Sequence, residues 1–257
     1  MNDTEKNVNR YSTESRLGIF LLLMMSILII VGSLTNTDDI ENLKEENVVK
    51  HMIHRAVSSI EITSGDTTKR QVIFTFDGGS GAKSGQEILA TLAKHKIKGT
   101  FFLTGKFIEE NIGLVKQIVK DGHEVFNHTY DHPYLTALSD ADIIVELDRT
   151  NNLLSSTTGS YTRPYFRTPY GDRDARVLDV AFKHGYQSVY WTVDAHDWQE
   201  TSGVTSKDVT DRIFSSLAPG NIYLMHIGDS ITGNILDDVF TKIEEKGYNI
   251  VSLTQGL

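Results

Sequence analysis

The stretch VIFTFDGGSGAKSG, residues 72–85, decides the fold class of this chain. Five strand-forming residues lead into one acid, Asp77, and four glycines fall within the next eight positions. A strand that ends in a glycine-rich turn ahead of a helix is typical of α/β proteins, which often place their chemistry at that turn. The stretch therefore predicts an α/β fold with functional groups near Asp77. It leaves two kinds of chemistry open: phosphate binding, or acid–base and metal chemistry.

Phosphate binding is the weaker of these two interpretations. A phosphate-binding loop of the G-x-x-x-x-G-K-[ST] type needs glycines where this chain has Asp77 and Ala82, so only Lys83 and Ser84 fit. Those glycines are required because backbone N–H groups must wrap closely around the phosphate. The formal net charge of −9 also argues against nucleic acid, whose backbone attracts basic surfaces. We expect neither a nucleotide nor a nucleic acid as a partner.

Strand-like and helical patterns alternate through the C-terminal part of the chain. The strand-like runs cover residues 71–76, 99–103, 123–127, 164–167, 187–193, 221–225 and 249–253. Helical patterns lie between most of them; the one over 139–156 begins at Ser139, and two others end at Gly185 and Gly247. Repeated strand–helix units predict a parallel sheet, either barrel-like or open and doubly wound. Residues 70–257 are enough for one such domain.

The N-terminal part of the chain contains an uncharged apolar run at residues 17–34. As a helix it would be roughly 27 Å long, close to the thickness of a bilayer core. Basic residues occur within residues 1–16, which favours a cytoplasmic N-terminus. We expect a single-pass membrane anchor, residues 35–69 as a juxtamembrane spacer, and the domain at 70–257 outside the cytoplasm. A cleaved signal peptide is the second interpretation. A buried helix is the weakest, because the run is apolar on every face.

Ionisable residues follow successive predicted strands, and the carboxyl ends of a parallel sheet would gather them at one edge. They are Asp77, His128 with His132, Arg167, Asp197 and His226. The spacing of His128 and His132 lets two imidazoles converge on one metal from a single helical turn, which the following proline would end. The chain has no cysteine, so any metal must be held by His, Asp or Glu. The set as a whole predicts an active site.

This ordered set resembles the polysaccharide deacetylases of the NodB-homology type, carbohydrate esterase family 4. The resemblance covers roughly residues 70–257 and rests on five motifs in the family's order. They are T-F-D at 75–77, H-x-x-x-H at 128–132, R-x-P-Y-G at 167–171, D-x-x-D-W at 194–198 and L-x-H at 224–226. The resemblance implies a distorted (β/α) barrel, usually with seven strands.

The same resemblance implies an activity, the metal-dependent hydrolysis of the N-acetyl group of GlcNAc or MurNAc residues in a polysaccharide. With a membrane anchor, peptidoglycan is the expected polymer. His128 and His132 would hold a divalent metal, zinc first, with cobalt or nickel as alternatives. Asp77 would be the general base that takes a proton from water, and Arg167 would fix it in place.

The remaining motif residues take the other roles that the resemblance implies. His226 would protonate the leaving amine, and Asp197 would orient its imidazole. The backbone N–H of Tyr170 would receive the oxyanion. Trp198 and Leu224 would line a small apolar pocket for the acetyl methyl group.

One position departs from the family's pattern. The first motif is usually T-F-D-D, and its second aspartate is the third metal ligand, but here that position is Gly78. Water, Asp77 or Asp131 would have to complete the coordination, or the metal would bind too weakly for catalysis. Two alternatives to N-deacetylation stay open. One is an O-acetyl esterase acting on a polysaccharide such as acetylated xylan, and the other is a glycan-binding module without activity.

Overall fold

A parallel β-sheet forms the centre of the computed structural model, which describes residues 61–79 and 81–257. All strand pairs in this sheet are parallel. The strands are β1 Gln71–Gly78, β2 Thr100–Leu103, β3 Glu124–Asn127, β4 Tyr165–Phe166, β5 Gln187–Ser188, β6 Val193–Asp194, β7 Ile222–His226 and β8 Asn249–Val251. The α/β class expected from the sequence is confirmed.

The strands follow one path, β5-β4-β3-β2-β1-β7-β6, and β8 pairs with β1 beside that path. Seven strands in this order form a half-barrel, which agrees with the barrel that the family resemblance implies. β1 is the central strand and is buried along its whole length. The long apolar run that opens the domain therefore becomes the strand with the most neighbours in the sheet.

Side chains of β1 alternate between two apolar clusters. Val72, Phe74 and Phe76 belong to the large cluster between the sheet and the helices. Ile73 belongs instead to the cluster inside the curved sheet, together with Leu253. This alternation is the ordinary period of two of a β-strand. It places Asp77, in phase with Ile73, on the inner side of the sheet.

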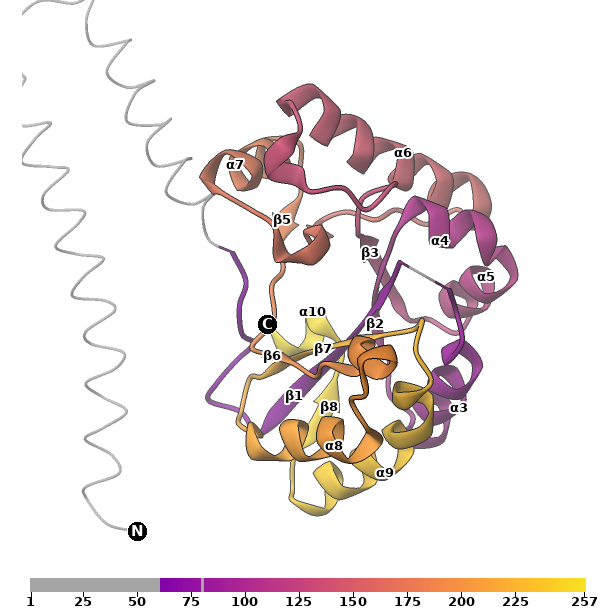
Figure 1. Cartoon of the computed structure of the whole chain (residues 1–257), viewed down its shortest axis with the longest axis vertical. Helices are drawn as coiled ribbons and strands as arrows, with labels where there is room; N and C mark the ends of the chain where they lie inside the picture. Colours follow the sequence, from indigo (N-terminus) through magenta and orange to yellow (C-terminus); the bar gives the residue numbers. More distant parts are fainter. Residues whose placement is uncertain (1–60, 80) are drawn as a thin grey trace, which may run out of the picture. The chain divides into compact units, whose positions relative to one another are not determined.

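Helices cover the outer side of the sheet (Figure 1). The α-helices are α3 Gly85–His95, α4 Gly105–Glu110, α5 Ile112–Lys120, α6 Asp140–Thr158, α7 Ala175–Lys183, α8 Ser206–Ser215, α9 Ile231–Glu245 and α10 Leu253–Gly256. The predicted start of α6 is confirmed, because the Ser139 side chain accepts a hydrogen bond from the Asp142 N–H. Gly185 and Gly247, after α7 and α9, have positive φ of 88° and 75°, as predicted for glycines that end helices.

The single strand predicted over residues 187–193 is wrong. Two short strands replace it, β5 and β6, and they lie at opposite ends of the sheet path. Two carbonyl oxygens between them bond to a side chain: the Arg167 guanidinium donates to the carbonyl oxygens of Val189 (3.1 Å) and Tyr190 (3.3 Å). The Val189 N–H still bonds to the Phe166 carbonyl oxygen of β4 at 2.9 Å, but the carbonyl oxygens of Val189 and Tyr190 are taken by the Arg167 side chain, so β5 and β6 do not join into one strand.

The predicted cytoplasmic segment, residues 1–16, and the predicted anchor, residues 17–34, lie outside the described residues. Within residues 61–79 and 81–257, no helix has the length and apolar character needed to cross a bilayer. The end of the predicted spacer is bonded to the domain. The Ile62 N–H donates to the Ser188 carbonyl at 2.9 Å, and Glu61 pairs with Arg173 at 2.7 Å.

Candidate active site

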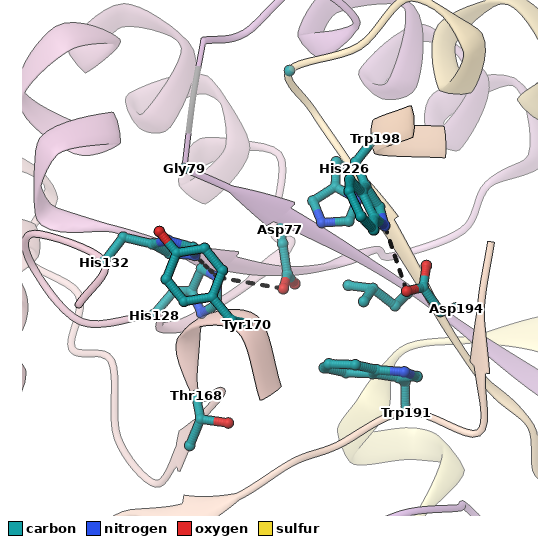
Figure 2. Close-up of a pocket in the computed structure, with 12 residues that line it drawn as sticks. Asp77, Gly79, His128, His132, Thr168, Tyr170, Trp191, Asp194, Trp198 and His226 are labelled. Carbon is teal, nitrogen blue, oxygen red and sulfur yellow. Dashed lines mark hydrogen bonds and ion pairs between the residues drawn. The ribbon is translucent and has the colours of Figure 1, made fainter. Parts of the chain in front are cut away.

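A cavity of about 590 Å³ opens at the carboxyl ends of the strands (Figure 2). Its walls come from β1, β6 and β7 and from the segments that follow β1, β3, β4, β5, β6 and β7. The lining residues are Asp77, Gly79, His128, His132, Thr168, Tyr170, Trp191, Asp194, Trp198, Leu224, His226 and Gly228. Most residues singled out from the sequence therefore meet in one place. Arg167 and Asp197 lie directly behind the cavity wall, fully buried.

Asp77 and Arg167 form a buried ion pair on one side of the cavity. The Arg167 Nη1 donates to Asp77 Oδ1 at 2.7 Å and to the Thr75 hydroxyl oxygen at 2.8 Å. Thr75 in turn donates to the Tyr223 carbonyl oxygen at 2.7 Å. Arg167 is fully buried and Asp77 is 3% exposed, so the pair is held by the fold rather than by solvent. Asp77 Oδ2 stays free of Arg167 and is 3.5 Å from His128 Nε2.

The two histidines of the H-x-x-x-H motif lie beside Asp77. His128 Nδ1 bonds to the Arg167 carbonyl oxygen at 2.9 Å, so Nδ1 carries the proton and Nε2 presents a lone pair. Burial lowers the pKa of His128, and burial together with the nearby His128 lowers the pKa of His132 to about 3. The two Nε2 atoms are 3.2 Å apart. Two nitrogen ligands of one tetrahedral metal are about 3.3–3.4 Å apart, so the pair fits a shared divalent cation.

The loop that carries these histidines is not the helical turn predicted from their spacing. Thr129 and His132 have positive φ, 66° and 59°, which no α-helix allows. Two side chains that the sequence analysis missed hold the loop. Asn127 Oδ1 accepts the Thr129 N–H at 2.8 Å, and Glu146 accepts the N–H groups of the next two residues, each at 2.8 Å. The only sequence signal for Asn127 is its place at the end of a strand, directly before His128.

We call Asp77, Arg167, His128 and His132 the base side of the cavity, and His226, Asp197 and Thr232 the acid side. Asp77 and His226 are direct partners in the register of β1 and β7, so the two sides meet there. In Figure 2, Asp77 lies between the histidine pair and His226.

On the acid side, Asp197 holds His226 through two contacts and is itself held by Thr232. Its Oδ1 is 2.9 Å from His226 Nδ1, and its Oδ2 accepts the His226 backbone N–H at 2.6 Å. The Thr232 hydroxyl also donates to Oδ2, at 2.6 Å. Burial alone would lower the pKa of His226, but the hydrogen bond and charge of Asp197 outweigh it and raise that pKa to about 9. The imidazole is therefore protonated at neutral pH and can give a proton through Nε2.

A second acid, missed by the sequence analysis, is buried behind the acid side. Asp229 is 7% exposed, and its Oδ1 accepts the Thr232 N–H at 2.8 Å, whereas Oδ2 has no hydrogen-bond partner among the described residues. Burial and the charge of Asp197 raise the pKa of Asp229 to about 7. This acid is therefore largely neutral below pH 7, beside the charged Asp197.

Aromatic and apolar side chains form the rest of the cavity. Leu224 is buried in it, and Trp198 is exposed, with its Nε1–H 3.4 Å from Asp194 Oδ2. Tyr170 has a positive φ of 58°, and its exposed ring contacts the His132 ring at a centroid distance of 4.4 Å. Trp191 was missed because its segment was predicted to be a regular strand.

A third protein ligand beside the two histidines is absent from the described residues, which contain no cluster of three His, Cys, Asp or Glu side chains suited to a metal. Asp131 does not fill the place as proposed from the sequence. Its Oδ1 pairs with Lys106 at 2.8 Å and its Oδ2 with Arg149 at 3.0 Å. Asp77 Oδ2 is the remaining carboxylate oxygen near the pair.

Comparisons with known proteins agree with this geometry. The family model for polysaccharide deacetylases matches residues 64–189. The peptidoglycan-N-acetylmuramic acid deacetylase PdaA of Bacillus subtilis is 33% identical over 189 residues, covering 74% of this chain and 72% of PdaA. The peptidoglycan-N-acetylglucosamine deacetylase PgdA of Listeria monocytogenes is 32% identical over 210 residues, covering 81% of this chain but only 43% of PgdA.

Among solved structures, the chain is similar to BA3943 of Bacillus anthracis, described as a CE4 family pseudoenzyme. The wild-type structure has a TM-score of 0.72 and 33% identity, covering 77% of this chain and 68% of BA3943. A BA3943 mutant described as having restored enzymatic activity matches equally well, with a TM-score of 0.72 and 34% identity over 77% of this chain and 71% of that one. The chain is thus similar both to proteins named as deacetylases and to a pseudoenzyme.

Proposed function

The chain belongs to the polysaccharide deacetylase family, and we propose that it hydrolyses the N-acetyl group of GlcNAc or MurNAc residues in peptidoglycan. One observation carries the proposal. A proton acceptor fixed by Arg167 and a protonated imidazole fixed by Asp197 are partners across β1 and β7, in one cavity. Amide hydrolysis needs such a pair, because water must lose a proton and the amine must gain one before it leaves.

In the proposed reaction, Asp77 Oδ2 accepts a proton from water as the water oxygen bonds to the acetyl carbon. The Tyr170 N–H donates to the carbonyl oxygen as negative charge develops there. His226 then gives its Nε2 proton to the nitrogen as the C–N bond breaks, leaving an amine and acetic acid, which loses its remaining proton to solvent and becomes acetate. Leu224 and Trp198 provide an apolar surface for the methyl group.

His128 and His132 would hold a divalent cation, zinc first and cobalt or nickel next. When bound, such a cation polarises the acetyl carbonyl and lowers the pKa of water. The fit rests on the 3.2 Å separation of the two Nε2 atoms and on the Arg167 carbonyl that fixes the His128 tautomer. The family's second aspartate is missing, which favours a weak site.

The test is acetate release from peptidoglycan and chitooligosaccharides by the full chain, with Zn²⁺, Co²⁺ or Ni²⁺ added. We expect release with at least one metal and a loss of about 10²–10⁴-fold in both Asp77→Asn and His226→Ala. Lys116→Ala, in the exposed part of α5, is the matched control and should keep full activity. Full amide activity in His226→Ala would refute the assigned proton donor.

A second candidate, a glycan-binding module without activity, is favoured by the glycine at position 78 and by the similarity to BA3943. It predicts glycan binding with no acetate release under any metal. Glycan binding is measured by isothermal titration in the same preparations. An inactive enzyme preparation would show neither glycan binding nor acetate release, whereas a binding module would still bind the glycan.

We propose further that residues 17–34 anchor the chain in the cell membrane, with the domain outside the cytoplasm. The uncharged apolar run and the basic residues before it support this orientation. Membrane fractionation with external protease should digest the domain and leave residues 1–16 protected. A mature chain in the soluble fraction that lacks the run, identified by mass, would instead indicate a cleaved signal peptide.

A further inference from the structure

The end of the predicted spacer lies along the segment that joins β5 and β6. The Tyr190 N–H donates to the Ile62 carbonyl oxygen at 2.7 Å. The Thr192 hydroxyl donates to the Thr63 carbonyl oxygen at 2.8 Å. These bonds place Glu61, the residue before Ile62, next to the segment that carries Tyr190.

Glu61 holds the guanidinium of Arg173 in a bidentate ion pair. Glu61 Oε1 accepts from Arg173 Nε at 2.7 Å, and Oε2 accepts from Nη2 at 2.8 Å. The Ser188 hydroxyl of β5 donates to Oε1 at 2.8 Å and fixes the carboxylate in turn. The Glu61 side chain is 12% exposed and the Arg173 side chain 26%. Such a pair fixes the plane of the guanidinium as well as its position.

Arg173 connects two walls of the cavity without lining it. Its Cζ lies 3.5 Å from the centre of the Tyr190 ring, and that ring stacks on Trp191 with 3.8 Å between centroids and 16° between planes. Its Nη1 donates to the Gly171 carbonyl oxygen at 3.0 Å, directly after Tyr170. Trp191 and Tyr170 both line the cavity, as Figure 2 shows. One guanidinium therefore supports both walls.

The turn and the stacked rings are also packed against each other. A Cβ atom on Gly171 would lie 2.9 Å from Trp191 Cη2 and 2.9 Å from the Tyr190 hydroxyl oxygen. Because interiors packed this closely transmit small shifts, movement of the rings would displace the turn.

We infer that Arg173, fixed by Glu61, is a positioning residue that sets the ring of Trp191 and the turn of Tyr170. Loss of the guanidinium removes the cation–π contact with Tyr190 and the bond to the turn at once, so the half-buried indole gains freedom. The positioning stands on these contacts, whereas the binding of an acetylated sugar by the positioned groups rests on the proposed function.

The test follows Trp191 without metal or substrate. Full-length chains that carry Trp198→Phe report on Trp191 alone, because the chain has two tryptophans. We expect Arg173→Ala to raise the acrylamide quenching constant of Trp191 about twofold, with a smaller rise in Glu61→Ala. In chains with both tryptophans, Arg173→Ala should lower kcat/KM for acetate release about tenfold.

Arg163→Ala is the matched control. Arg163 also pairs with an acid, Asp148 at 3.4 Å, and lies 4.8 Å from a tyrosine ring, that of Tyr186. None of these three residues lines the cavity, so the quenching of Trp191 and kcat/KM should stay at their wild-type values.

Melting temperatures confirm that each variant is folded. Where Arg173→Ala does not fold, Arg173→Lys decides, because lysine keeps the charge but not the fork that pairs with Glu61, and it should raise the quenching constant in the same direction. Unchanged quenching in a folded Arg173 variant, or an equal rise in Arg163→Ala, would overturn the inference. The expected rise in a chain whose wild type releases no acetate with any metal would leave the inference standing and refute the proposed activity.

Discussion

The acid and base sides of the cavity differ in how many hydrogen bonds hold their carboxylates in place. On the acid side, both oxygens of Asp197 are taken, by the His226 ring and backbone and by Thr232. On the base side, Asp77 has one oxygen on Arg167 and one facing His128 without a normal hydrogen bond, and Gly79 leaves space beside His132. The fold therefore fixes the proton donor of the acid side through more hydrogen bonds than the proton acceptor of the base side.

The largest effect on stability is expected from removing the Arg167 guanidinium, the positive partner of the base-side ion pair. Arg167→Met leaves Asp77 buried without its partner, which should cost about 3–5 kcal/mol of unfolding free energy in urea titrations. Arg176→Met removes an exposed pair with Asp140 and should cost at most about 1 kcal/mol. Equal losses of unfolding free energy in the two variants would show that the buried ion pair contributes no more to stability than an exposed one.

Asp197→Asn should break the acid side while leaving the base side intact. The pKa of His226 should fall from about 9 toward its ordinary value of 6.5, measured by NMR of the ring protons. Because the folded pKa lies above 6.5, the protonated form stabilises the wild type fully below pH 6.5, and this contribution is lost as the pH rises through 9. The variant should lose that dependence on pH. An unchanged pKa would show that Asp197 does not set the charge of His226.

The next largest effect is expected from a substitution that disturbs the close packing beneath the loop of His128 and His132. A Cβ on Gly105 would lie 2.0 Å from Tyr130 Cδ2, so Gly105→Ala should destabilise the fold by about 1–3 kcal/mol and weaken zinc binding. Gly113→Ala is the matched control, since nothing lies within 4 Å of its Cβ in α5, and it should gain about 0.5–1 kcal/mol. A neutral Gly105→Ala would show that the loop can shift at no cost.

Asp229→Asn is expected to have the smallest effect, and a favourable one. With a folded pKa of about 7 against 3.8, Asp229 stays protonated longer in the folded state, so it lowers stability as the pH rises from 3.8 through 7. The amide removes that penalty, so the variant should be more stable than wild type above pH 7 and equal to it near pH 4. Urea titrations at both pH values test this, and a loss of stability above pH 7 would contradict it.

Much of the site could be predicted because it follows strand order. Asp77, Arg167 and His226 stand at or next to strand ends, and parallel strands bring those ends together regardless of loop conformation.

What the sequence could not predict is set by contacts distant along the chain. The positive φ of Thr129 and His132 depends on the loop being held by Asn127 and by Glu146 from α6, and no local pattern marks that arrangement. The split of residues 187–193 likewise depends on the Arg167 side chain, which takes the carbonyls that a continuous strand would use.

Both tryptophans of the chain, Trp191 and Trp198, line the cavity. Intrinsic tryptophan emission is therefore a signal from this site alone, with no contribution from the rest of the protein. Binding of a sugar, binding of a metal beside His132, or loss of the His226 proton could each be followed through the intrinsic tryptophan fluorescence of the unlabelled chain.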